Sequence, residues 1–282
     1  MFPISDSWNR QPPAFTRINS SLPIARGIKA FFDMRIGVDL ITGNRASSDT
    51  AAFAGSRYGT ARDFSGTANV QFAHHPNYAI IGPLTIIAFI ERDAATDYSE
   101  IISKNSTITT HVPYSWRLGD STTGSDTSFL RANAFYDIYY GNGASLHLTG
   151  EKEVIGLKIA DASIDTIPRV MHGRGQFTTL TLKASFGSGD CTDDGASSVY
   201  IGRRSDGVAQ LDGRIYWIAL WQRELTDREM FSFYLNPWQL FEPDPLTVFW
   251  PKAAAAAGIT GPLIGSSHLL TNGPLINGRL AA

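Results

Sequence analysis

The chain has 282 residues, 43% hydrophobic and 18% charged, so it is long enough to bury a substantial core and we expect one main domain. The formal net charge is only −2 and no basic block carries interleaved aromatic residues, which argues against a nucleic-acid partner. Apolar runs have strand length and the first residues lack the pattern of a secretory signal, so neither membrane insertion nor a signal peptide is expected. Cys191 is the only cysteine, which excludes an intrachain disulfide and fits synthesis in a reducing cytoplasm.

Residues 1–27 hold four prolines among small polar residues, a composition that predicts an extended N-terminal arm. Phe2, Trp8 and Phe15 lie in this arm, and large aromatic side chains usually cover a surface. Trp8 is therefore a candidate contact with a partner. The alternative is a passive terminus.

Residues 40–60 are rich in Gly, Ser, Thr and Asn and predict a loop. A short alternating strand is expected at Asn69–Phe72, followed by the pair His74 and His75. Adjacent residues in an extended chain point to opposite sides and no Cys or carboxylate cluster completes a metal site, so we interpret this pair as part of a loop. The β-branched run Leu84–Ile90 predicts a central, buried strand.

Between residues 105 and 150, short strands alternate with turn clusters, which is typical of a sandwich. Exposed aromatic rings on such strands can stack on the apolar face of a pyranose while polar neighbours bond its hydroxyls. Core packing and subunit contact are the more common uses of these residues. The candidates for ligand or partner contact are Tyr114, Trp116, Tyr136, Tyr139 and Tyr140.

Two carboxylates, Glu151 and Glu153, open the strand Val154–Ile159 and would point to one face, a spacing that a glycosidase could use for its acid and its nucleophile. The residues that follow are Val-Ile-Gly-Leu rather than another acid, and no serine lies in a G-x-S-x-G elbow. We interpret the pair as a solvated strand start and predict no catalytic residues and no enzymatic activity.

The loop of residues 187–195 places Asp190, Asp193 and Asp194 close together. Hard oxygen ligands on a flexible loop suit calcium, although Asp with Gly is also the ordinary chemistry of a turn. We expect no obligate cofactor and keep calcium at these three residues as the alternative.

The stretch from Arg214 to Trp221 is apolar or aromatic at almost every position, which predicts a strand covered on both sides. Strict alternation would place Ile215, Trp217, Ala219 and Trp221 on one face and Tyr216, Ile218 and Leu220 on the other.

A short helix is expected directly after this strand. Thr226 and Glu229 have the spacing of a capping box, and Leu225 and Met230 occupy the positions of a hydrophobic staple. The helix therefore begins at Thr226, and it should end at Asn236-Pro237 because proline lacks an amide and disfavours helical geometry before it.

Residues 242–282 are rich in Pro and Gly and predict a C-terminal arm. Phe249 and Trp250 form a short aromatic piece, and the sequence Gly-Pro-Leu-Ile at residues 261–264 recurs at 273–276. Such a segment buries too little surface to order itself, yet it is too apolar for a purely soluble tail. We expect it to dock on a partner.

Several motifs occur in the order found in laminin-G-like, concanavalin A-like jelly rolls. They are the Ala61–Gly66 segment, Leu84–Ile90, Glu100–Lys104, Ser198–Arg203 and the closing strand-turn-helix unit. The resemblance spans roughly residues 28–236 and implies a first strand within residues 27–39. The Asn-Pro-Trp-Gln-Leu-Phe ending at 236–241 and the Gly-Pro-Leu tail further resemble bacteriophage virion proteins that carry this domain.

The resemblance implies an all-β antiparallel sandwich at residues 28–241, flanked by the two arms. It also implies a non-enzymatic structural protein of the virion, an accessory, decorating or fibre component of head or tail. Such a protein would be made in the host cytoplasm, form homo-oligomers and contact other virion proteins through its arms. The alternative is a glycan-binding adhesin that recognises a surface polysaccharide. A glycosidase is the weakest reading, because the E-x-D-x-x-E pattern of laminarinase-like enzymes on this scaffold is missing.

Overall fold

The computed structural model describes residues 11–12, 17–56, 59–94, 99–104, 111–118, 127–132, 137–142, 150–185, 189–193, 195–205, 207 and 210–241. The chain divides into two units, Met1–Glu242 and Pro243–Ala282, and every described residue belongs to the first unit. In the described part no helix combines the length and the apolar content needed to cross a membrane.

The first of two sheets has nine strands, and every pair in it is antiparallel. Its central strands carry the longest apolar runs, which is why they are covered on both faces. In spatial order they are β14 (Gln176–Thr179), β13 (Arg169–His172), β12 (Lys152–Ile159), β7 (Leu84–Arg92), β17 (Gly213–Trp221), β1 (Ile28–Asp33) and β2 (Val38–Asp39). A hairpin of β4 (Ala52–Ser56) and β5 (Gly59–Asp63) joins this sheet through the pairing of β5 with β17.

The second sheet has eight strands, also paired antiparallel throughout. Their spatial order is β15 (Thr181–Ser185), β11 (Asp137–Asn142), β10 (Thr127–Ala132), β9 (Val112–Leu118), β8 (Ser99–Lys104), β16 (Val199–Ile201), β6 (Val70–Phe72) and β3 (Ser48–Asp49). Two 3-10 turns, η2 (Pro23–Ala25) and η3 (Pro76–Tyr78), and the helix α1 (Asp227–Leu235) complete the described elements. The predicted antiparallel β-sandwich is confirmed.

The main core lies between the two sheets. Phe32, Ile86 and Leu220 of the nine-stranded sheet and Trp116 and Phe129 of the eight-stranded sheet are fully buried in one cluster. Each comes from a strand whose alternate residues point inward, so the packing follows directly from the strand period.

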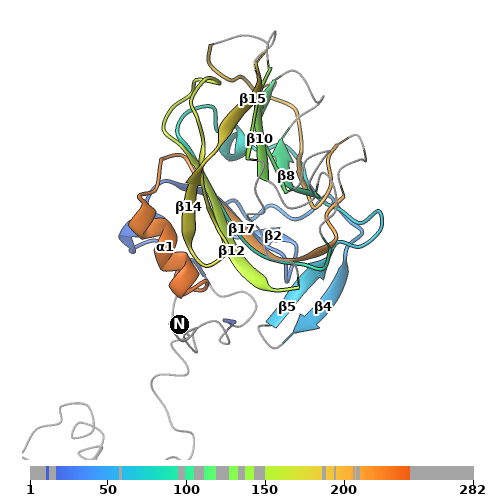
Figure 1. Ribbon diagram of the computed structural model, residues 1–282. Coiled ribbons are helices and arrows are strands. Elements are labelled where there is room, and N and C mark those ends of the chain that lie inside the picture. Colours follow the sequence, from blue (N-terminus) through green and yellow to red (C-terminus); the bar gives the residue numbers. More distant parts are fainter. Residues whose placement is uncertain are drawn as a thin grey trace, which may run out of the picture. The chain divides into compact units, whose positions relative to one another are not determined.

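A second core, here called the outer core, covers the opposite face of the nine-stranded sheet. Helix α1 packs on this face, and Figure 1 shows it next to strands β12 and β14. Phe233 of α1 lies 5.5 Å from Trp221 and 5.9 Å from Trp217, measured between ring centroids. The residues of strand β17 are therefore buried on both faces, as the sequence predicts.

The predicted facing of β17 is wrong at its start. Ile215 lies in the core between the sheets and Tyr216 lies in the outer core, the reverse of the expected order. The register with β7 shifts between Ile215 and Trp217, so this β-bulge adds one residue and inverts the alternation before it. From Trp217 onward the predicted facing is correct.

The loop predicted for residues 40–60 is also wrong in part, because β3 and β4 lie within it. Small residues such as Ala and Gly have weak strand preference, and here the pairing with β5 and β6 decides. Strands β13 to β15 had no predicted counterpart. Residues 17–27 pack on the sandwich: Asn19 N–H donates to Leu240 O at 2.7 Å, and the Trp221 indole donates to Ile24 O at 2.8 Å.

Helix α1 begins as predicted. Thr226 is its N-cap, and both bonds of the capping box are present: Glu229 N–H donates to Thr226 Oγ1 at 3.2 Å and Thr226 N–H donates to Glu229 Oε2 at 2.8 Å. Arg223 also donates to Glu229 Oε1 at 2.6 Å. Hydrogen bonds from Arg223 and Thr226 lower the pKa of Glu229 from its ordinary 4.5 to about 2.

Because the pKa of Glu229 is lower in the folded state, its charge stabilises the fold above its ordinary pKa, and this contribution is lost as pH falls through about 2. We expect Glu229→Gln to lower the free energy of unfolding at pH 7 by about 1 kcal/mol, since glutamine keeps the cap and the pair is partly exposed. This deficit should vanish near pH 2. Glu229→Ala removes the cap as well as the charge, so its deficit should be about 2 kcal/mol at pH 7 and should fall to about 1 kcal/mol near pH 2. Urea unfolding at the two pH values measures both, and a pH-independent deficit for the glutamine variant contradicts the charge assignment.

Candidate functional site

Hairpin β4–β5 presents an aromatic ring to solvent. Phe53 is 62% exposed, the largest exposure of any large hydrophobic residue in the described part of the chain. Its register partner across the hairpin is Arg62, whose guanidinium carbon lies 3.5 Å from the ring centroid. Directly opposed residues of an antiparallel pair share a face, so the guanidinium stacks on one side of the ring.

Arg62 is buried, and its guanidinium is held by two neighbours. It forms an ion pair with Asp49 Oδ2, and its Nη1 donates to Ala51 O at 3.5 Å. Burial lowers the pKa of Arg62 and the Asp49 carboxylate opposes this shift. Since Asp49 belongs to β3 of the eight-stranded sheet and Arg62 to β5, the pair lies where the edges of the two sheets meet. The Phe53 ring stacked on Arg62, here called the Phe53 platform, is therefore held by both sheets.

Asp49, which forms the ion pair with Arg62, is followed in the chain by Thr50, and Thr50 is bonded to Asn69. Thr50 N–H donates to Asn69 O and Asn69 N–H donates to Thr50 Oγ1, each at 2.9 Å. Thr50 and Asp49 are exposed. The described residues thus hold an exposed ring, the arginine stacked on it and the carboxylate paired with that arginine. An apolar stacking surface and hydrogen-bond acceptors are the two requirements of sugar recognition.

Sequence reasoning did not single out Phe53. It lies in the stretch that was predicted to be a loop, and a lone exposed phenylalanine is common on protein surfaces. A signal is nevertheless present, because Phe53 is the only aromatic residue between positions 40 and 57.

The aromatic candidates on β9 need correction. Tyr114 and Trp116 are fully buried between the sheets, where the Trp116 indole donates to Thr127 Oγ1 at 2.9 Å. Burial raises the pKa of Tyr114 well above its usual range. These rings are core residues and offer no stacking face to a sugar. Tyr139 and Tyr140 lie in β11 and are described by their backbone alone, and Trp8, Tyr136, Phe249 and Trp250 lie outside the described residues.

In the predicted calcium loop, Asp193 forms an ion pair with the buried Lys104 and accepts the Gly195 N–H at 3.1 Å through Oδ2. Asp190 is exposed, and its backbone pairs with Ser163. The described residues contain no group of three His, Cys, Asp or Glu that could hold a metal ion, and Asp194 lies outside them. Calcium at this loop stays a prediction.

The paired carboxylates do not share an environment. Glu151 is exposed, whereas Glu153 is buried, accepts the Gly173 N–H at 3.1 Å and acts on Arg92, whose pKa its charge raises against the larger effect of burial. Of the two adjacent histidines, His75 serves the local turn, where its Nδ1 accepts the Asn77 N–H at 3.1 Å and caps η3.

No protein-family model matches the chain, and no curated protein matches it. Solved structures share its fold. Domain 4 of AbnA, a GH43 extracellular arabinanase from Geobacillus stearothermophilus, is 10% identical with a TM-score of 0.50, over 74% of this chain and 98% of that domain. The Trypanosoma rangeli sialidase is 15% identical with a TM-score of 0.52, over 77% of this chain and 34% of the sialidase.

The binding domain of Paraclostridial Mosquitocidal Protein 1 is 11% identical with a TM-score of 0.50, over 75% of this chain and 52% of that domain. The chain thus spans about a third of the sialidase and half of the toxin domain. At these identities the likeness shows the fold alone. It supports the predicted lectin-like jelly roll.

Proposed function

We propose that this protein is a non-catalytic module that binds glycans, with hairpin β4–β5 as its recognition site. The observation that carries the proposal is the exposed Phe53 ring, which stacks on Arg62, while Arg62 in turn pairs with the carboxylate of Asp49. A pyranose would stack its apolar face on Phe53 and donate hydroxyls to Asp49 and Thr50.

The mounting of the ring favours recognition over incidental exposure. A platform held by a buried arginine loses little conformational freedom when a ligand arrives, so less binding free energy is spent on ordering. The fold relatives are compatible with this role: domain 4 of AbnA was solved in complex with arabinotriose and the sialidase in complex with sialic acid.

We do not expect Glu151 and Glu153 to act as a catalytic pair that hydrolyses the bound glycan. A glycosidase needs two carboxyl groups facing one cleft, about 5 to 10 Å apart. Glu153 is buried and already accepts the Gly173 N–H, while Glu151 is exposed. Incubation with any bound polysaccharide should therefore release no reducing ends.

Phe53→Ala should weaken binding of the recognised glycan by roughly tenfold to a hundredfold, because it removes the stacking surface. The fold should remain intact, since a mostly exposed side chain adds little to stability. The measurement is a screen on a polysaccharide array followed by isothermal titration of each hit. The matched control is Phe231→Ala, which removes another partly exposed ring, 37% exposed and located on α1. Equal affinity for Phe53→Ala and wild type, or no hit on a broad array, refutes the proposal.

The role in a bacteriophage particle stays a prediction, as do homo-oligomer assembly and contact with virion proteins through residues 1–27 and 242–282. The phage role rests on the resemblance of the 236–241 ending and of the Gly-Pro-Leu tail to bacteriophage virion proteins. The docking of the two segments rests on their aromatic and Gly-Pro-Leu content. We expect deletion of residues 253–282 to leave the sandwich folded, with an unchanged thermal midpoint, but to weaken self-association or attachment to the particle. Sedimentation and particle-binding assays test this. A truncated protein that assembles and attaches like the full chain contradicts it.

A further inference from the structure

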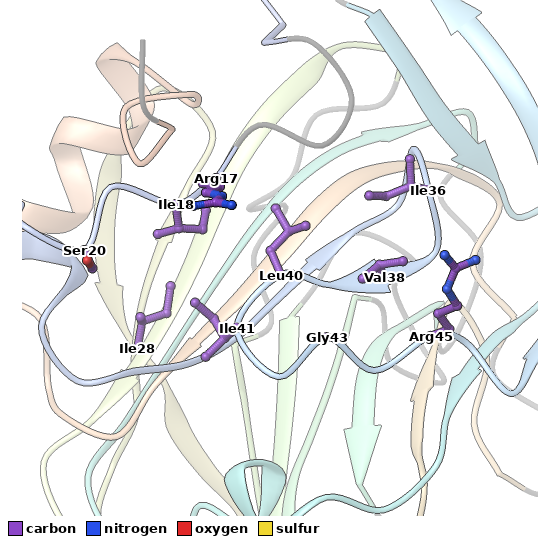
Figure 2. Close-up of a pocket in the computed structure, with 10 residues that line it drawn as sticks. All are labelled: Arg17, Ile18, Ser20, Ile28, Ile36, Val38, Leu40, Ile41, Gly43 and Arg45. Carbon is purple, nitrogen blue, oxygen red and sulfur yellow. The ribbon is translucent and has the colours of Figure 1, made fainter. Parts of the chain in front are cut away.

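A groove of about 490 Å³ lies beside β2, on a different set of residues from the Phe53 platform. Its volume falls within the range of small-molecule sites. Figure 2 shows Leu40 and Ile41 in its middle, with Arg17 and Arg45 on either side of them in this view. The aliphatic lining consists of Ile18, Ile28, Ile36, Val38, Leu40 and Ile41.

The apolar lining of the groove is only partly buried. Four of its residues pack against the outer core and remain half-buried: Ile18, Ile28, Leu40 and Ile41. The apolar lining residues that the structure describes are all branched and aliphatic, so this part of the groove offers a hydrocarbon surface without a stacking face. Covering such a surface is favourable in proportion to the apolar area removed from water.

Two positive charges flank the groove, and the described residues that line it include no carboxylate. Arg17 and Arg45 are exposed, and neither makes an ion pair or a hydrogen bond to another described residue. Like charges with no counter-ion in the described part of the chain favour an anionic ligand, since guanidinium groups bind carboxylate and phosphate in bidentate geometry.

The backbone around the groove is already paired, which disfavours an extended peptide. Asp39 N–H donates to Asn44 O at 2.8 Å and Ala46 N–H donates to Gly37 O at 2.9 Å, so the outer edge of β2 is occupied. Leu40 N–H donates to Phe31 O at 2.9 Å. A peptide strand docks mainly through main-chain hydrogen bonds, and these donors are not free to make them.

From these three properties we infer that the groove binds a fatty acid, with the aliphatic chain along Leu40 and Ile41 and the carboxylate paired with Arg17 or Arg45. A saturated chain needs only apolar contact, and its carboxylate needs only a cation at the end of the groove. The inference is independent of the glycan proposal, because it uses none of the residues of the Phe53 platform.

The test is isothermal titration of the full-length protein with sodium dodecanoate below its micelle concentration. We expect saturable binding, and roughly tenfold weaker binding by the double variant Arg17→Gln/Arg45→Gln. Arg228→Gln is the matched control, since Arg228 is an exposed arginine on α1 with no described partner, and it should bind like wild type. Ile41→Gln, which interrupts the half-buried hydrocarbon surface, should also weaken binding, with circular dichroism melts confirming the fold.

Head-group analogues with the same chain decide the charge assignment. Dodecanol and dodecyltrimethylammonium should bind more weakly than dodecanoate to wild type and should be insensitive to the double arginine substitution. Equal binding of all three, or no saturable binding of dodecanoate, overturns the inference. So does a double variant whose sedimentation coefficient changes while its dodecanoate affinity does not, because the groove would then be covered by a second copy of the chain.

Discussion

Replacing Trp217 by alanine should lower the free energy of unfolding by roughly 3 to 5 kcal/mol, the range for removing a large buried aromatic side chain. Trp217 is fully buried in the outer core, with ring centroids 5.3 Å from Phe31 and 5.9 Å from Phe233. It therefore joins three elements, β1, β17 and α1. Removing the indole leaves a cavity that its neighbours cannot close, because strand pairing holds the backbones of β1 and β17 in place.

Trp217→Phe is the matched control. The indole Nε1 has no hydrogen-bond partner among the described residues, so phenylalanine loses volume but no hydrogen bond. We expect that variant to lose less than half of the alanine effect. Both are measured by urea unfolding with a two-state fit. An alanine variant with a wild-type midpoint contradicts the placement of Trp217 at the sheet-helix interface.

The second large effect is expected at Gly213, the first residue of β17. Its φ is +150°, and a Cβ there would lie 2.2 Å from Glu91 O and 2.9 Å from Arg92 Cα in the neighbouring strand β7. These are backbone atoms in the centre of the sheet, so they cannot give way as a side chain could. Gly213→Ala should therefore cost roughly 3 kcal/mol or more, from the clash and the backbone strain together.

Gly66→Ala separates the two contributions. Gly66 also has a positive φ, +68°, but a Cβ there would meet no atom within 4 Å. We expect it to cost only about 1 to 2 kcal/mol, the price of the left-handed backbone. Thermal and urea unfolding of both variants provide the comparison. If the two substitutions cost the same, steric exclusion at Gly213 plays no part.

The closing unit shows which features follow from local sequence. Thr226 and Glu229 cap α1 as predicted because both bonds of a capping box form between residues three apart. Asn236 and Pro237 end it for an equally local reason, since proline cannot continue the helical hydrogen bonding. The β7 and β17 strands could be predicted because their apolar runs are too long to leave either face in water.

The exposure of the candidate site residues could not be predicted from local sequence. Alternation shows that Tyr114 and Trp116 share a face of β9, but it does not say whether that face is turned inward. The structure turns it toward the opposite sheet, so these rings became core residues. Phe53 lies on β4, the outer strand of a hairpin that joins the sheet through the first residues of β17, and there it faces solvent.

The sequence by itself determined the strand-rich class, the buried central strands and the capped helix, because these depend on residue period and on contacts a few positions apart. Only the tertiary structure decided the bulge that turns Tyr216 outward, the Arg62 and Asp49 pair beneath Phe53 and the arginine-flanked groove. Each depends on how distant strands pair and register. A shift of one residue in pairing reverses which side chains face the core, and that choice is made by the packing of the whole sandwich.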